Sequence, residues 1–178
     1  MKVFGPTKVF GIAGWSGSGK TTLLIRLIPV LVRRGVQVAT VKHTHHHPAI
    51  GDDESRALFA AGVTEVMAAS PSRFSLIHPL PGEDEPRLEH MAGLVGGVDL
   101  LLVEGFKFAP HPKLEVWDPA LGKPMLAPEQ PSVVALATDG SVENHGRPVF
   151  RRDDVDSIAD FILAWPAAAD AVFTGPPA

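Results

Sequence analysis

One segment of eight residues, from position 14 to position 21, constrains the fold of this chain more than any other. Its sequence, Gly-Trp-Ser-Gly-Ser-Gly-Lys-Thr, fits the phosphate-binding pattern G-x-x-x-x-G-K-[ST]. An apolar run suited to a buried strand, residues 9–13, precedes it, and residues 22–28 open a helical pattern. A chance turn rich in glycine and serine would explain neither the Lys-Thr pair nor the two flanking elements. We therefore predict a strand, a phosphate-binding loop and a helix, in this order.

Each residue type in the loop has a physical role in holding a triphosphate. Glycine lets backbone N–H groups approach the phosphates in dihedral angles that other residues disfavour, and the helix N-terminus adds partial positive charge. Lys20 would reach the β- and γ-phosphates, which gives it a catalytic as well as a binding role, and the Thr21 hydroxyl would ligate Mg²⁺. The predicted nucleotide-binding residues of the loop are Gly14, Ser16, Gly17, Ser18, Gly19, Lys20 and Thr21.

Composition narrows the class of protein. The 178 residues suit one domain, and the formal net charge of -4 argues against nucleic acid as the main partner. The absence of cysteine excludes disulfides, thiolate metal sites and a cysteine nucleophile. The first six residues lack the apolar core of a signal peptide, and no apolar run approaches membrane-spanning length. We therefore expect a cytoplasmic protein without a membrane segment.

Alternating strand and helix patterns predict a three-layer α/β fold of the P-loop NTPase type with a mostly parallel sheet. The tight link between residues 65–69 and 73–77 adds an antiparallel hairpin or edge strand beside that sheet. We expect one nucleotide-binding domain over residues 1–165 and a loose tail over 166–178. The expected strands are 9–13, 36–41, 65–69, 73–77, 98–103, 113–117 and 132–137, and the expected helices are 19–34, 53–61, 87–94 and 153–165.

Two acidic residues stand where parallel strands end, the edge at which such sheets bind ligands. Glu104 follows the most hydrophobic strand, and we predict that it holds Mg²⁺ or positions the attacking water, unless it is a buried structural carboxylate. Asp139 ends another strand and is a candidate for reading a guanine base through its N1 and N2 donors. An ordinary Asp-Gly turn explains Asp139 about as well.

The segment from Lys42 to His47 holds four of the eight histidines. Lys42 and His43, at a predicted strand end, suit a phosphate or a pterin, while the cluster also permits a metal site or a solvated loop. Asp53 or Ser55 could cap the next helix or present an acid to Mg²⁺. Three further cations, Arg73, Lys107 and Lys113, are expected in solvent.

Taken in order, these segments resemble the molybdopterin-guanine dinucleotide biosynthesis protein B (MobB) family over roughly residues 8 to 140. The specific segments are Val-Lys-His-Thr-His-His at 41–46, Glu-Ser-Arg at 54–56, Leu-Val-Glu-Gly-Phe-Lys at 102–107 and Lys-Leu-Glu-Val at 113–116. The family's usual Lys-Asp-Ser stands here as Asp-Glu-Ser at 53–55, so no acid role is carried over to that position.

The resemblance implies a GTP-binding, weakly hydrolysing homodimer that uses Mg²⁺. It would assist the nucleotidyltransferase that joins GMP to molybdopterin, with molybdopterin itself as a possible ligand. By position, Thr22 joins the phosphate-binding residues, and Glu104 is the acid on the Mg²⁺ side.

Two other functions fit the loop. A GTPase chaperone for nickel insertion could use the histidine cluster, although the cysteine motif expected of such a protein is absent. A small-molecule kinase would need an arginine-bearing lid, for which Arg151 and Arg152 are the only adjacent pair in the second half of the chain.

Overall fold

The computed structural model describes residues 7–43, 53–78, 87–95, 97–142 and 146–166. They belong to two compact units: residues 1–43 with 88–178, and residues 44–87. The expectation of one domain over residues 1–165 stays a prediction, and all but the first residue of the expected tail lies outside the described residues.

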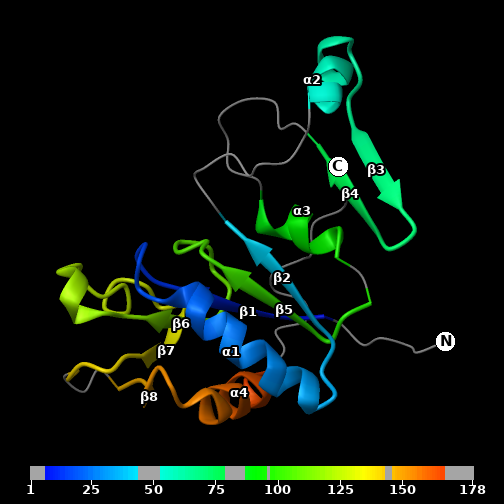
Figure 1. The fold of residues 1–178 in the computed structure, drawn as a ribbon. Helices are drawn as coiled ribbons and strands as arrows, with labels where there is room; N and C mark the ends of the chain where they lie inside the picture. The colour runs from blue at the N-terminus through cyan, green and yellow to red at the C-terminus, as the bar shows by residue number, and fades with distance from the viewer. Residues whose placement is uncertain (1–6, 44–52, 79–86, 96, 143–145, 167–178) are drawn as a thin grey trace. The chain divides into compact units, whose positions relative to one another are not determined.

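A six-stranded sheet forms the centre of the first unit (Figure 1). Its order is β2 (Val38–Lys42), β5 (Leu100–Glu104), β1 (Lys8–Ala13), β6 (Lys113–Val116), β7 (Val133–Ala137) and β8 (Val149–Phe150). Every neighbouring pair in it is parallel. The predicted α/β fold with a mostly parallel sheet is therefore confirmed, and all six strands end at one edge.

Helices cover both faces of this sheet, because the side chains of β5 alternate between two apolar clusters. Leu100 and Leu102 pack in a core with residues of α1 (Lys20–Arg33) and α4 (Val155–Ala164), which lie side by side on one face in Figure 1. Leu101 and Val103 pack with Leu88 of α3 (Leu88–Gly93), on the other face. β5 is buried along its whole length, so its last residue, Glu104, has a fixed place.

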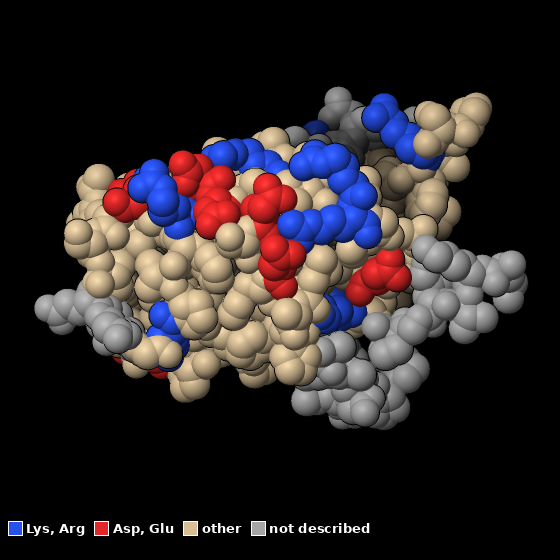
Figure 2. Space-filling view, turned by 90° about the horizontal axis from the view of Figure 1, so that it is seen from below, with Lys and Arg blue, Asp and Glu red and all other residues tan. Residues whose placement is uncertain are grey.

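Ion pairs between α1 and α4 tie the two helices together at the surface. The Arg34 guanidinium lies 3.1 Å from a carboxylate oxygen of Asp156 and 2.5 Å from one of Asp160. The face on which these helices lie mixes acidic and basic side chains (Figure 2), as the small net charge suggests. Exposed pairs of this kind contribute little stability, so the apolar core carries the packing of α1.

The second unit contains α2 (Asp53–Ala60) and the strands β3 (Val66–Ser70) and β4 (Arg73–Ile77). β3 and β4 pair antiparallel, which confirms the predicted hairpin. They form a two-stranded sheet of their own and add no strand to the parallel sheet.

Two elements were not predicted from the sequence: β8 and the single 3₁₀ turn η1 (Pro119–Leu121). β8 pairs only two residues with β7, too few to produce a periodic pattern. The predicted helices and strands are all present, with ends that differ by one or two residues. Within the described residues, none of the helices has the length and apolar character needed to cross a membrane.

Candidate nucleotide-binding site

The loop between β1 and α1 has a backbone that only glycine can adopt. Gly14 has φ of 137°, and a Cβ atom there would lie 2.3 Å from the carbonyl oxygen of Val116. Gly17 and Gly19 also have positive φ, at 83° and 96°. The loop therefore turns tightly at the sheet edge and leads directly into the first turn of α1.

The first turn of α1 is open to an anion. Gly19 stands at the N-cap, and no side chain of the described residues caps that turn. Thr21 and Thr22 are exposed, as is Ser16, whereas Ser18 is buried and its hydroxyl has no partner among the described residues. The unpaired N–H groups and positive dipole end of such a turn are suited to phosphate.

Three of the predicted side chains meet beside this turn. The Thr21 hydroxyl donates to Glu104 Oε1 at 2.8 Å, and Lys20 Nζ donates to the Trp15 carbonyl at 2.8 Å. Partial burial lowers the pKa of Lys20, with Glu104 opposing the shift and Lys107 and Lys42 adding to it. A hydroxyl and a carboxylate are hard oxygen donors, so the pair Thr21–Glu104 fits Mg²⁺ in its chemistry.

Lys42 is brought to the same place by strand pairing. It is the last residue of β2 and the register partner of Glu104 in β5. Its Nζ lies 3.2 Å from Glu104 Oε1 and 3.3 Å from Thr21 Oγ1. His43 follows, with its ring 4.8 Å from the ring of Phe106. Lys42 and Glu104, the last residues of their strands, and Lys20, the first residue of α1, therefore share one edge.

The other histidines of the cluster, His45, His46 and His47, lie outside the described residues. Among the described residues, there is no group of three or more His, Asp or Glu side chains that could hold a metal ion. The side chains of Asp53 and Glu54 are likewise outside the description, while Ser55 is buried in α2.

Asp139 lies on the other side of the loop, in contact with Arg152. Its carboxylate accepts from Arg152 Nε at 2.7 Å and from the Arg152 backbone N–H at 3.2 Å. The hydrogen bond from Arg152 lowers the pKa of Asp139. Arg152 Nη1 also reaches Asp118 Oδ2 at 3.2 Å and the carbonyl oxygen of Ser18 at 3.4 Å. Arg152 thus connects Asp139 to the phosphate-binding loop.

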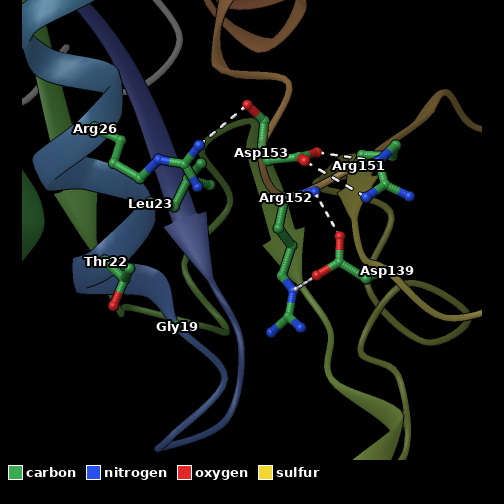
Figure 3. Close-up of a pocket in the computed structure, with 8 residues that line it drawn as sticks. All are labelled: Gly19, Thr22, Leu23, Arg26, Asp139, Arg151, Arg152 and Asp153. Atoms are coloured by element: carbon green, nitrogen blue, oxygen red, sulfur yellow. Dashed lines mark hydrogen bonds and ion pairs between the residues drawn. The ribbon is translucent and has the colours of Figure 1, made fainter.

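A pocket of about 290 Å³ lies between α1 and this group of residues. Figure 3 shows Gly19, Thr22 and Arg26 on the α1 side and Asp139 and Arg152 across from them. The residues that line this pocket are Gly19, Thr22, Leu23, Arg26, Asp139, Arg151, Arg152 and Asp153. The pocket therefore runs from the start of α1, where phosphates would bind, to a carboxylate suited to a donor-rich base.

Comparison with known proteins shows the family of this chain. The family model for molybdopterin guanine dinucleotide synthesis protein B matches residues 9–139. The chain belongs to the MobB family. It is 35% identical over 162 residues to the molybdopterin-guanine dinucleotide biosynthesis adapter protein of Escherichia coli (strain K12), covering 88% of this chain and 92% of that protein. The Haemophilus influenzae adapter protein is 36% identical over 161 residues, covering 88% of each.

Solved structures of MobB proteins have the same fold. The crystal structure of molybdopterin-guanine biosynthesis protein B matches with a TM-score of 0.67 and 31% identity, covering 87% of this chain and 97% of that one. A Bacillus subtilis MobB structure matches with a TM-score of 0.66 and 25% identity, covering 88% and 96%.

Two lysines of this MobB family member have surroundings that the sequence did not indicate. The expectation that Lys113 lies in solvent is wrong: it is fully buried, and its Nζ donates to the carbonyl oxygens of Lys107 and Ala109 and to Ser132 Oγ. Burial lowers the pKa of Lys113 to about 8. Lys113 thus holds the segment that contains Lys107. The Nζ of Lys107 lies 4.2 Å from the ring centroid of Trp15 in the loop between β1 and α1.

Next to Lys113 lies a histidine with no hydrogen bond among the described residues. His111 is fully buried, and neither ring nitrogen has a partner. It packs where β1 carries Gly11, since a Cβ atom at Gly11 would lie 2.5 Å from His111 Nε2. Burial, with a smaller contribution from the charge of Lys113, lowers the pKa of His111 to about 3. This imidazole is therefore neutral in the folded protein at neutral pH.

The pKa of His111 makes stability depend on pH. The unfolded chain binds a proton below the ordinary value of 6.5, whereas the folded chain does so only near 3, so stability is full above 6.5 and falls between these values. In urea unfolding, wild type should lose about 1.4 kcal/mol per pH unit more than His111→Leu in this window. Replacement of the exposed His90 by Gln serves as the control. Equal acid slopes in wild type and His111→Leu would contradict the assignment.

Proposed function

We propose that this chain is a GTP-binding adapter protein in the biosynthesis of molybdopterin-guanine dinucleotide. The adapter role is the one that its Escherichia coli and Haemophilus influenzae relatives carry in their names, over 88% of this chain. The observation that supports a nucleotide as ligand is the junction of the phosphate-binding loop with the Thr21–Glu104 pair. The pocket that leads from Thr22 to Asp139 supports guanine as the base.

Different parts of the nucleotide would contact different residues along this edge of the sheet. Gly17, Gly19, Lys20 and Thr22 bind the phosphates, and Thr21 and Glu104 hold Mg²⁺, which neutralises phosphate charge when bound. The Asp139 carboxylate accepts from the N1–H and N2–H groups of guanine, after Arg152 gives up one of its contacts to that carboxylate.

The adapter works with the nucleotidyltransferase that attaches GMP to molybdopterin, and its own GTP hydrolysis is weak. Lys42 lies beside Glu104 at the end of β2 and His43 follows it, so these two residues would contact an anionic group, either a phosphate of the nucleotide or the pterin. Because GTP is a nucleotide of the cytoplasm, we place the protein there. Arg151 and Arg152 are engaged with Asp153 and Asp139, which does not favour the kinase alternative.

Replacement of Lys20 tests the nucleotide site. Lys20→Ala removes charge-assisted contacts to the phosphates, which are worth about 1.5–3 kcal/mol, so GTP affinity should fall roughly ten- to hundredfold. Titration calorimetry with Mg²⁺ measures this, and the slow release of phosphate from GTP should fall with it. Arg33→Ala, at the exposed far end of the same helix, is the matched control. Unchanged affinity in a folded Lys20→Ala protein would refute the site.

The base-reading role of Asp139 has a more selective test. An asparagine amide can donate to the O2 atom of xanthine, where guanine instead presents an amino group. Asp139→Asn should therefore weaken GTP binding and strengthen XTP binding, each by about tenfold, or roughly 1.4 kcal/mol. Asp118→Asn is the control, because it loses the other carboxylate contact to Arg152 without altering the base reader. If both variants change the affinities for GTP and XTP equally, Asp139 only pairs with Arg152 and does not contact the base.

We also propose a homodimer, supported by an exposed apolar face on the hairpin. Met67 lies opposite Leu76, and Ala69 opposite Phe74, so all four share one face of β3–β4. Met67 is 63% exposed and Phe74 71%, more than an isolated monomer favours. Light scattering should give twice the chain mass of 18.9 kDa. Phe74→Asp should shift the protein to monomer, unlike Ser75→Asp on the opposite face; a monomeric wild type excludes the proposal.

A further inference from the structure

A lysine ammonium lies between the two side chains that fit Mg²⁺. Thr21 Oγ1 and Glu104 Oε1 are 2.8 Å apart, and Lys42 Nζ is 3.3 Å from the first and 3.2 Å from the second. The two oxygen atoms that would face the metal therefore both face one positive charge. The Lys42 ammonium thus already balances the negative charge of Glu104 beside the Thr21 hydroxyl.

The position of Lys42 follows from the sheet. Lys42 and Glu104 are the last residues of β2 and β5 and lie side by side in the register of these parallel strands. The backbone continues this contact, since the His43 N–H donates to the Glu104 carbonyl at 2.9 Å. The side chain of Glu104 is only 10% exposed, whereas that of Lys42 is 56% exposed. The carboxylate is thus fixed and shielded, and the lysine head is the part that can move.

A shielded carboxylate requires a counter-charge, because removal of an ion from water without a partner is costly. Lys42 supplies this charge when no metal is present. An ammonium and Mg²⁺ cannot both lie between the same two oxygen atoms, since like charges at such distances repel strongly in a shielded site. Arrival of the metal must displace Lys42 from Glu104.

The charge balance of the site indicates where Lys42 then goes. Lys20 feels the positive charges of both Lys42 and Lys107 and the negative charge of a single carboxylate, Glu104, to which Lys42 is also paired. When Mg²⁺ takes the place beside Glu104, the ammonium of Lys42 is released next to the loop that binds the phosphates. A nucleoside triphosphate carries negative charge beyond what one Mg²⁺ neutralises, and so provides the anion that Lys42 needs.

We propose that Lys42 is an internal substitute for Mg²⁺: it holds Thr21 and Glu104 in place until the metal arrives, and it is exchanged for the metal when nucleotide binds. The inference rests on the proposed Mg²⁺-nucleotide site and adds a positioning residue to it. Its consequence is that Lys42 competes with the metal in the free protein and partly replaces it when nucleotide binds without metal.

The first experiment needs no nucleotide. Mn²⁺, which prefers the same oxygen ligands and is visible by electron paramagnetic resonance, is titrated into the nucleotide-free protein. Lys42→Met removes the competing charge and keeps the length of the side chain, so Mn²⁺ should bind at least about tenfold more tightly than to wild type, equivalent to roughly 1.4 kcal/mol. Lys107→Met is the matched control, because its ammonium lies over Trp15 and not between the two donors. No gain in Lys42→Met, or an equal gain in both variants, overturns the proposal.

The second experiment measures GTP affinity with Mg²⁺ and with a chelator. The ratio of the two dissociation constants should be larger in Lys42→Met than in wild type by about tenfold, because the variant has lost its substitute cation. The same ratio in both proteins would overturn the exchange. If Mn²⁺ binding responds to Lys42→Met but no protein binds GTP, the proposed function fails while the cation exchange at Thr21 and Glu104 stands.

Discussion

The contact between Thr21 and Glu104 is the interaction on which the rest of the site depends. It joins the first turn of α1 to the end of β5, two elements separated by 83 positions in the chain. The contact exists because β1 and β5 are parallel neighbours and β5 is buried along its length. A strand enclosed on both faces cannot shift its register without disturbing the close packing of its side chains against both layers. The fixed strand therefore fixes the carboxylate, and the carboxylate orients the hydroxyl.

A second group of charges connects the pocket to the same loop from the other side. Arg152 contacts Asp139 after β7, Asp118 after β6 and the carbonyl of Ser18 in the loop. A base bound at Asp139 would compete with Arg152 for the carboxylate. Because Arg152 also contacts the loop, occupation of the pocket would alter that contact. Lys42 makes a similar exchange possible on the metal side. In both places a positive side chain satisfies a carboxylate that, in the proposed function, serves a ligand.

Residues beside a short local motif were predicted well from the sequence, whereas residues whose surroundings depend on distant parts of the chain were not. Lys20, Thr21 and Glu104 were predicted to lie together because each stands beside a strong local pattern, and the structure brings them to one edge because the strands are parallel. Arg152 gave no comparable signal, since it follows a strand of two residues. Lys113 was misplaced because a lysine is ordinarily expected in solvent. A possible signal was the alternation of Lys113 and Glu115 in a strand that lies inside the sheet, where both faces are covered.

Local patterns in the sequence were enough to predict the glycine-rich loop between β1 and α1, the order of the predicted helices and strands, and the family to which the chain belongs. These depend on glycine dihedral angles, on apolar periodicity and on short motifs, all of which are local in the chain. Three other features became visible only in the folded chain: Lys42 lies between Thr21 and Glu104, Arg152 holds Asp139, and Lys113 and His111 are buried. Those contacts depend on which strands are neighbours in the sheet. Strand order arises from the packing of the whole core, which no short segment specifies.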